Sequence, residues 1–193
     1  MLAYLGTATI CLTLFFSLSQ FFFSRKSSQI KLVNFSVNAQ LLFSLFAFIF
    51  LIYAYIVSDF SVKNVFQNSH STKPLIYKIS AVWGNHEGSM LLWILVLTLF
   101  NYFIFKFFNS KNSKLILKTL EIQSLIIFGF VLFSLLTSNP FEKILPVPEN
   151  GLGFNPILQD PALAIHPPLL YIGYVGFSAA FSISVATLSL DKN

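Results

Sequence analysis

Charged side chains are scarce in this sequence. They account for 10% of its 193 residues, whereas soluble domains carry roughly a quarter. Hydrophobic residues reach 55%, and the mean hydropathy is +0.74. This composition excludes an ordinary soluble domain and indicates a membrane protein. The formal net charge of +5 does not indicate a nucleic-acid partner, because the basic residues form no long block.

Cysteine is almost absent as well. The single Cys11 lies in the first apolar run, so the chain has no internal disulfide, no CxxC motif and no CxxCH motif. The sequence also lacks a glycine-rich phosphate loop, zinc-type His/Cys spacing and a recognisable catalytic triad. Motifs therefore identify no enzyme by themselves. Phenylalanine, by contrast, occurs 24 times beside 8 glycines, a bias that we interpret as the mark of an AT-rich organelle genome.

Long apolar runs are what the sequence does contain. They predict helices at residues 3–23, 37–57, 90–108, 115–137 and 168–190. Each run is about 20 residues long, which suffices to cross about 30 Å of hydrocarbon. We therefore expect an all-α, polytopic membrane protein whose single domain covers residues 1–193, with long loops at 58–89 and 138–167. The first run lacks the basic n-region of a cleaved signal peptide and is expected to stay as a helix.

The distribution of charge predicts the orientation in the membrane. The loops after the first and third helices are basic, with Arg25, Lys26, Lys31, Lys111 and Lys114. The loops after the second and fourth helices mix both signs: Lys63, Lys73, Lys78, Lys143, Asp59, Glu87, Glu142, Glu149 and Asp160. The positive-inside rule then places the N-terminus outside and the C-terminus inside. All three histidines, His70, His86 and His166, fall in the predicted outer loops, so imidazole chemistry is expected on the outer face.

One histidine stands directly before two prolines at the start of the fifth run. Proline suits the first helical position because its φ is fixed and it has no N–H. A helix is therefore expected to begin near Pro167 or Pro168, with His166 at its mouth on the membrane surface. There a neutral imidazole can ligate iron, or it can simply satisfy nearby backbone groups. Asp160, in the preceding loop, is most simply a turn residue.

A second candidate segment, AVWGNHEGSMLLW, leads into the third run. Trp83 and Trp93 suit headgroup depth, where amphipathic rings anchor helices. Gly84 lets a flat ligand or another helix approach closely, and His86 stands next to Glu87. The alternative is an interfacial loop anchored by its tryptophans, with the charged pair solvated.

Two longer stretches contain these segments. They are DFSVKNVFQNSHSTKPLIYKISAVWGNHEGSMLLW at residues 59–93 and NPILQDPALAIHPPLLYIGYVGFS at residues 155–178. Both resemble the CcmF/NrfE family of cytochrome c haem lyases, and they occur in that family's order. The resemblance implies that His166 is one of two external axial ligands of haem iron. It also implies contributions to the outer surface near haem from Trp83, Gly84, His86, Glu87, Trp93, Asp160, Pro167 and Pro168.

The resemblance further implies a reaction and its partners. A b-type haem in transit to cytochrome c would arrive from the haem chaperone CcmE and be held on the outer face through axial histidines. Cysteine thiols of apocytochrome c would then add to its vinyl groups as thioethers. A CcmH-type thiol protein and membrane lipid complete the expected partners.

This sequence departs from the family pattern because it ends soon after the helix that follows His166. It lacks a tryptophan-rich WWD segment, a second external histidine and intramembrane histidines. We therefore expect the N-terminal piece of a divided lyase whose remaining pieces are partners, with no complete catalytic site on this chain alone. The expected location is the mitochondrial inner membrane, or a bacterial inner membrane if the chain is not organellar. His70 receives no role from the resemblance.

Two hypotheses from other classes stay open. The chain could be a non-catalytic scaffold of the cytochrome c maturation complex, or a helical subunit of a transporter or respiratory complex. A transporter should show ionisable groups at membrane depth. Lys118 and Glu121, in the first turns of the fourth run, are the only charged candidates; their i, i+3 spacing predicts an ion pair near the headgroups.

Overall fold

The structure, a computed structural model, describes residues 1–107, 113–153 and 160–191. Its elements in chain order are α1 (Leu2–Phe23), η1 (Ser27–Gln29), α2 (Ile30–Ile56), α3 (Lys63–Asn68), α4 (Leu75–Ala81), α5 (His86–Phe107), α6 (Ser113–Thr137) and α7 (Pro161–Leu190). Five of them, α1, α2, α5, α6 and α7, are long and apolar enough to cross a membrane. The prediction of an all-α membrane protein with five spans is confirmed.

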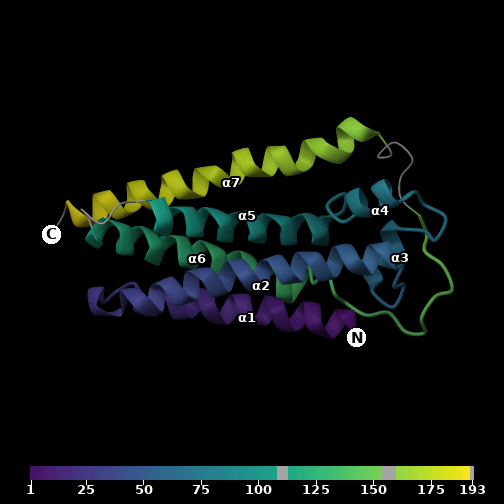
Figure 1. The fold of residues 1–193 in the computed structure, drawn as a ribbon, viewed down its shortest axis with the longest axis horizontal. Helices are drawn as coiled ribbons and strands as arrows, with labels where there is room; N and C mark the ends of the chain where they lie inside the picture. Colours follow the sequence, from purple (N-terminus) through teal and green to yellow (C-terminus); the bar gives the residue numbers. More distant parts are fainter. Residues whose placement is uncertain (108–112, 154–159, 192–193) are drawn as a thin grey trace.

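Four of these helices form a bundle, and the fifth lies on its side. Helix α1 packs against α2 and α6, and α5 packs against α2 and α6 in turn. Helix α7 lies outside this bundle along α5 and α6, and its N-terminal end lies beside α4 (Figure 1). The N-terminus, α3 and α4 lie at one end of the bundle, which we call the histidine-bearing end (Figure 1). The opposite end, with η1 and the start of α6, is called the basic end.

Three helices begin four or more residues earlier than the apolar runs predict. Helix α2 begins at Ile30 rather than at residue 37, α5 at His86 rather than at 90, and α7 at Pro161 rather than at 168. Part of the predicted loop 58–89 also folds, into α3 and α4. A polar residue ends an apolar run but does not end a helix, whose start is set by capping. Residue 108, Lys111 and the beginning of the second motif at 155–159 lie outside the described residues.

The buried face of α1 shows how the helices pack in lipid, where the hydrophobic effect does not drive their association. Its buried residues recur every three or four positions and are mostly small or polar: Ala3, Gly6, Thr9, Ile10, Thr13, Ser17 and Gln20. Large apolar side chains such as Phe15 and Phe22 point outward instead. Lipid tails are as apolar as these rings, so helices associate through close contact of small residues and through hydrogen bonds.

A network of amides crosses the bundle in its basic half. Gln20, Gln40 and Asn101, from α1, α2 and α5, are all fully buried. The Gln20 Nε2 donates to Asn101 Oδ1 (3.0 Å) and to the Leu120 carbonyl (2.9 Å). The Gln20 Oε1 accepts from Gln40 Nε2 (2.6 Å) and Asn101 Nδ2 (2.8 Å). With no water in the hydrocarbon layer, the amide N–H groups find acceptors within the bundle. These three residues are neutral, so the distribution of charged residues in the sequence does not reveal them.

Candidate functional site at the histidine-bearing end

The start of α7 corrects the expected position of His166. The Asp160 carboxylate Oδ1 accepts the Ala162 N–H at 2.8 Å, and the Asp160 carbonyl accepts the Ala164 N–H at 3.0 Å. Asp160 is therefore the N-cap and Pro161 the first helical residue, a combination that both positions favour. The expectation of a helix beginning at Pro167 or Pro168 is wrong, and Asp160 is a cap rather than a simple turn residue.

His166 consequently lies in the second turn of α7, on the face that points away from the bundle. Ala164, which is buried against the bundle, is two residues away and so about 200° around the helix. The imidazole is exposed, and no described residue hydrogen-bonds to it. Helix α7 has 30 residues, a length of about 45 Å against about 30 Å of hydrocarbon. Its first turns can therefore extend beyond the hydrocarbon layer.

The two prolines that follow His166 interrupt the backbone hydrogen bonding of α7. Since neither has an N–H, the carbonyl of Ala164 loses its helical partner at Pro168. The indole Nε1–H of Trp83 donates to this carbonyl at 2.8 Å. The Trp83 ring stacks on Phe48 of α2 with centroids 6.3 Å apart. Trp83 thus links the turn of α7 that carries His166 to the bundle, a connection between the two motifs that the sequence alone did not reveal.

An apolar groove of about 290 Å³ lies between α4 and the first turns of α7. Trp83 and Pro168 contribute to its wall together with Ile165 and Leu169. His166 is not among the residues of this wall, so the groove and the imidazole occupy different faces of α7. Gly84 is exposed near the turn between α4 and α5.

Trp93 is half-buried and packs towards neighbouring helices. Its ring packs against Phe130 of α6 and Tyr171 of α7, with centroid distances of 5.3 and 5.9 Å. It lies inside the junction of α5, α6 and α7, where it holds α7 against the bundle. Trp83 and Trp93 therefore both fix α7, one through a hydrogen bond and one through packing.

The turn before α5 is fixed by an asparagine that the sequence analysis did not identify. The Asn85 Oδ1 accepts the Gly88 N–H at 2.8 Å, which makes Asn85 the N-cap of α5. A Cβ at Gly88 would lie 1.6 Å from the Val82 carbonyl oxygen. Only glycine allows this close approach of backbone to backbone.

Glu87 and His86 both take part in contacts at this end. The Glu87 Oε2 accepts from Asn64 Nδ2 at 3.2 Å, and the same Nδ2 donates to Asn85 Oδ1 at 2.7 Å. Tyr55 completes this cluster by donating its hydroxyl to Asn64 Oδ1 at 2.5 Å. The His86 Nε2 lies 2.8 Å from the Ser138 Oγ at the end of α6. These contacts favour a structural role for both residues, which connect α3, α5 and α6.

Two further titratable residues of this end, His70 and Lys73, lie in the connection between α3 and α4. The His70 Nδ1 accepts the Thr72 N–H at 3.3 Å, within a local turn. Burial, and to a smaller extent the nearby Lys78 charge, lower the pKa of Lys73 to about 8. The Lys73 ammonium donates to the Asn68 carbonyl at 3.2 Å.

The donor set at this end fits one half of a haem site. His166 offers one exposed imidazole nitrogen, and Leu170, Tyr174 and Phe177 continue its face of α7 with exposed apolar side chains. A haem needs an axial nitrogen and apolar contact for its macrocycle. Within the described part of the chain, no group of three or more His, Cys, Asp or Glu residues could hold a metal ion.

Known proteins resemble this chain closely. The family described as "Cytochrome C assembly protein" matches residues 83–193. The chain is 54% identical to the cytochrome c-type biogenesis protein CycK of Rhizobium meliloti (strain 1021) over 81% of its length, covering 24% of that protein. It is 45% identical to the cytochrome c-type biogenesis protein CcmF of Escherichia coli (strain K12) over 74% of its length, covering 22% of that protein.

A solved structure agrees with these relatives. The structure titled "Cytochrome c Heme Lyase CcmF" superimposes with a TM-score of 0.85 and 25% sequence identity, over 99% of this chain and 31% of that chain. The chain thus spans about a quarter of the length of the curated relatives it matches. These relatives are biogenesis proteins and favour neither a transporter nor a respiratory subunit. Because the family match covers more than half of its residues, this chain belongs to the cytochrome c assembly protein family, among relatives of the CcmF and CycK type.

Proposed function

We propose that this chain forms the N-terminal part of a cytochrome c haem lyase and that His166 supplies one axial nitrogen to the iron of the haem that is being transferred. The observation that carries the proposal is the placement of His166. Its imidazole is exposed on the face of α7 turned away from the bundle, with no hydrogen-bond partner among the described residues. A histidine with a purely structural role would be expected to have such a partner.

The apolar surface beside His166 supports the same proposal. Leu170, Tyr174 and Phe177 follow it at helical spacing and are 42%, 64% and 75% exposed. Gly173 lies among them, and a Cβ there would meet no atom within 4 Å. A flat porphyrin edge or a helix from another part of the lyase can lie against this face.

The rest of the haem site is assigned to parts of the lyase outside these 193 residues. They would supply the second external histidine and the WWD segment. Haem would come from a chaperone of the CcmE type, and apocytochrome c would present thiols kept reduced by a CcmH-type protein. We propose the outer face as the place of this reaction, with the histidine-bearing end outside, since the opposite end holds the basic loops.

The chain's own contribution to the reaction would be position. Trp83 fixes the turn of α7 that carries His166, and Asp160 fixes where that helix begins. The His166 imidazole would hold the haem iron, and the vinyl groups of the porphyrin would then keep one position relative to an incoming CxxCH segment. Bringing haem and thiolate together in fixed geometry replaces an encounter in solution, which can lower the activation free energy by several kcal/mol.

The proposal is tested by replacing His166 with alanine in the intact lyase complex and recording the haem absorbance spectrum. Loss or a shift of the external haem signal is expected, together with loss of covalent attachment. His70→Ala is the matched control, because His70 lies at the same end and its ring contacts only its own local turn among the described residues. An unchanged spectrum in the His166→Ala complex would leave the scaffold function.

The scaffold function has one observation in its favour. The exposed face of α7 continues through Phe181 and Leu188, which are 58% and 63% exposed, well beyond reach of a haem near His166. A chain that only binds other assembly proteins would need such a surface. The two functions differ in one respect: only the lyase requires the imidazole.

For the location we propose the mitochondrial inner membrane. The support is the bias towards phenylalanine, with 24 copies in 193 residues. Fractionation of the source cells, with this chain detected by antibody, checks the assignment. Recovery with the plasma membrane of a bacterium would contradict it without affecting the lyase proposal.

A further inference from the structure

The basic end carries a pocket that the proposed haem chemistry does not use. It measures about 560 Å³ and lies where the end of α1, the start of α6 and the last turn of α7 meet. Arg25, Lys114 and Lys118 line it together with one acid, Glu121. Three cations against one carboxylate leave this wall with two net positive charges.

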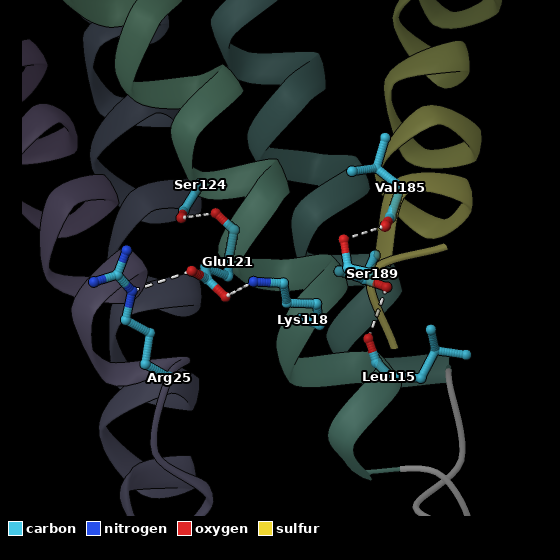
Figure 2. A network of polar contacts seen from close by, with 8 residues as sticks. Arg25, Leu115, Lys118, Glu121, Ser124, Val185 and Ser189 are labelled. Atoms are coloured by element: carbon cyan, nitrogen blue, oxygen red, sulfur yellow. Dashed lines mark hydrogen bonds and ion pairs between the residues drawn. The ribbon is translucent and has the colours of Figure 1, made fainter. Parts of the chain in front are cut away.

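Glu121 holds two of these cations in place. Its Oε1 lies 3.1 Å from Arg25 Nε, and its Oε2 lies 2.9 Å from Lys118 Nζ. Figure 2 shows the carboxylate between the two basic side chains, with the terminal nitrogens of Arg25 outside this ion pair. The guanidinium also lies 4.1 Å above the Phe21 ring. Arg25 is therefore fixed through Nε and its ring contact, while its terminal N–H groups can reach an anion.

A buried hydroxyl in the same wall lacks a partner. Ser24 is only 4% exposed and lines the pocket. Its Oγ makes no hydrogen bond within the part of the chain that the structure describes. A buried hydroxyl left unpaired is unfavourable. Among the described residues, Ser36, Gln40 and Ser69 also carry a buried oxygen without a partner, but of these four residues Ser24 alone lines this pocket, where a ligand can hydrogen-bond to it.

We propose that this pocket binds the headgroup phosphate of an anionic phospholipid. Basic pockets between membrane helices at the inner surface bind such headgroups. The Arg25 guanidinium, the Lys114 ammonium and the Ser24 hydroxyl supply donors of the types that bind phosphate. Leu117 and Leu190 add apolar surface to the lining. This surface can contact the glycerol and first methylenes of a lipid, whereas a free phosphate ion has no apolar part to place against it. This site does not depend on the haem function.

Native mass spectrometry of the purified 193-residue chain tests the proposal. Phosphatidylglycerol should remain bound where phosphatidylcholine does not. Ser24→Ala should weaken phosphatidylglycerol binding about tenfold, the effect of losing one hydrogen bond to a charged group. Lys114→Gln should weaken it about fivefold, as one cation near a lipid surface does. The Ser24→Ala protein should fold normally, because the hydroxyl that it loses has no partner within the described residues.

Lys31→Gln is the matched control, since Lys31 is an exposed lysine of the basic end outside the pocket. It should leave binding within twofold of the parent. Equal loss in Lys31→Gln and Lys114→Gln would overturn the proposal in favour of general surface charge. Displacement of phosphatidylglycerol by millimolar inorganic phosphate would overturn it in favour of a free-anion site. Binding of phosphatidylcholine as tight as that of phosphatidylglycerol would leave no role for the charges.

Discussion

The two ends of the bundle are built alike but leave different groups available. Each is tied by a cluster of neutral amides: Asn64 and Asn85 at the histidine-bearing end, and Gln20, Gln40 and Asn101 in the basic half. At the histidine-bearing end, the His166 imidazole lies on an outward face and has no hydrogen-bond partner among the described residues. At the basic end, the buried Ser24 hydroxyl has no partner within the part of the chain that the structure describes, and it lines a cationic pocket. The same means of packing thus supports the end for which we propose iron ligation and the end for which we propose anion binding.

The largest effect is expected from Gly88→Ala, which breaks the histidine-bearing end alone. The added Cβ would lie 1.6 Å from the Val82 carbonyl oxygen, so the start of α5 must shift. We expect about 3 kcal/mol of destabilisation, measured by unfolding in mixed detergent micelles. Gly129→Ala is the control, since a Cβ there meets no atom within 4 Å. Equal stability of the two variants would show that this turn is not closely packed.

The next effect comes from the basic half. Gln20→Leu removes the central amide and leaves Asn101, Gln40 and the Leu120 carbonyl without its hydrogen bonds. We expect a loss of about 2 kcal/mol in the same unfolding assay. Ser19→Ala, at a half-buried position of the same helix whose hydroxyl donates to the Phe15 carbonyl of that helix, should change stability by less than about 0.5 kcal/mol. If Gln20→Leu is as stable as the parent, the amides do not hold the helices together.

Trp83→Phe sharpens the comparison at the histidine-bearing end. It keeps a ring to stack on Phe48 and removes the hydrogen bond to the Ala164 carbonyl. The expected cost is about 1 kcal/mol of stability, together with weaker haem retention in the lyase complex. Trp93→Phe is the control, because no described residue accepts a hydrogen bond from its indole. Haem retention that falls equally in both variants would indicate ring packing, and the hydrogen bond would then have no special role.

The smallest effect concerns Lys73. Its pKa is lowered, mainly by burial, from the ordinary 10.5 to about 8. Below pH 8 both folded and unfolded chains hold the proton, and the unfavourable burial of the charge is fully present. Between pH 8 and 10.5 the unfolded chain binds more protons, so this group makes stability rise with pH. Competitive acylation across pH 6–11 should give a midpoint near 8 for Lys73. A midpoint near 10.5 would contradict the burial of its ammonium.

The sequence predicts the membrane helices well because lipid imposes a simple condition. A run of about 20 uncharged residues must form a helix to satisfy its backbone, and the pairing of Lys118 with Glu121 followed from their spacing and is confirmed at 2.9 Å. The start of α7 was not predicted, because the rule for a first-turn proline was applied to Pro167 and Pro168. Asp160 followed by Pro161 carried the same signal with a better cap.

The arrangement of the candidate site was harder to predict, for a physical reason. A proline inside a helix leaves the carbonyl four residues earlier without its helical N–H donor. Any other donor in the fold can then hydrogen-bond to that carbonyl. Trp83 donates to the Ala164 carbonyl because of the way α4 lies against α7. No local sequence pattern predicts that arrangement. Amides within apolar runs, such as Gln40 and Asn101, could have been recognised, because a polar side chain in hydrocarbon needs a partner.

The central claim is that the His166 imidazole ligates haem iron, and chemical rescue tests it most directly. In the lyase complex carrying His166→Gly, external haem should be lost and should return, with its absorbance spectrum, as imidazole is titrated in. The His70→Gly complex should neither lose haem nor respond to imidazole. Haem binding that survives His166→Gly without added imidazole would contradict the account.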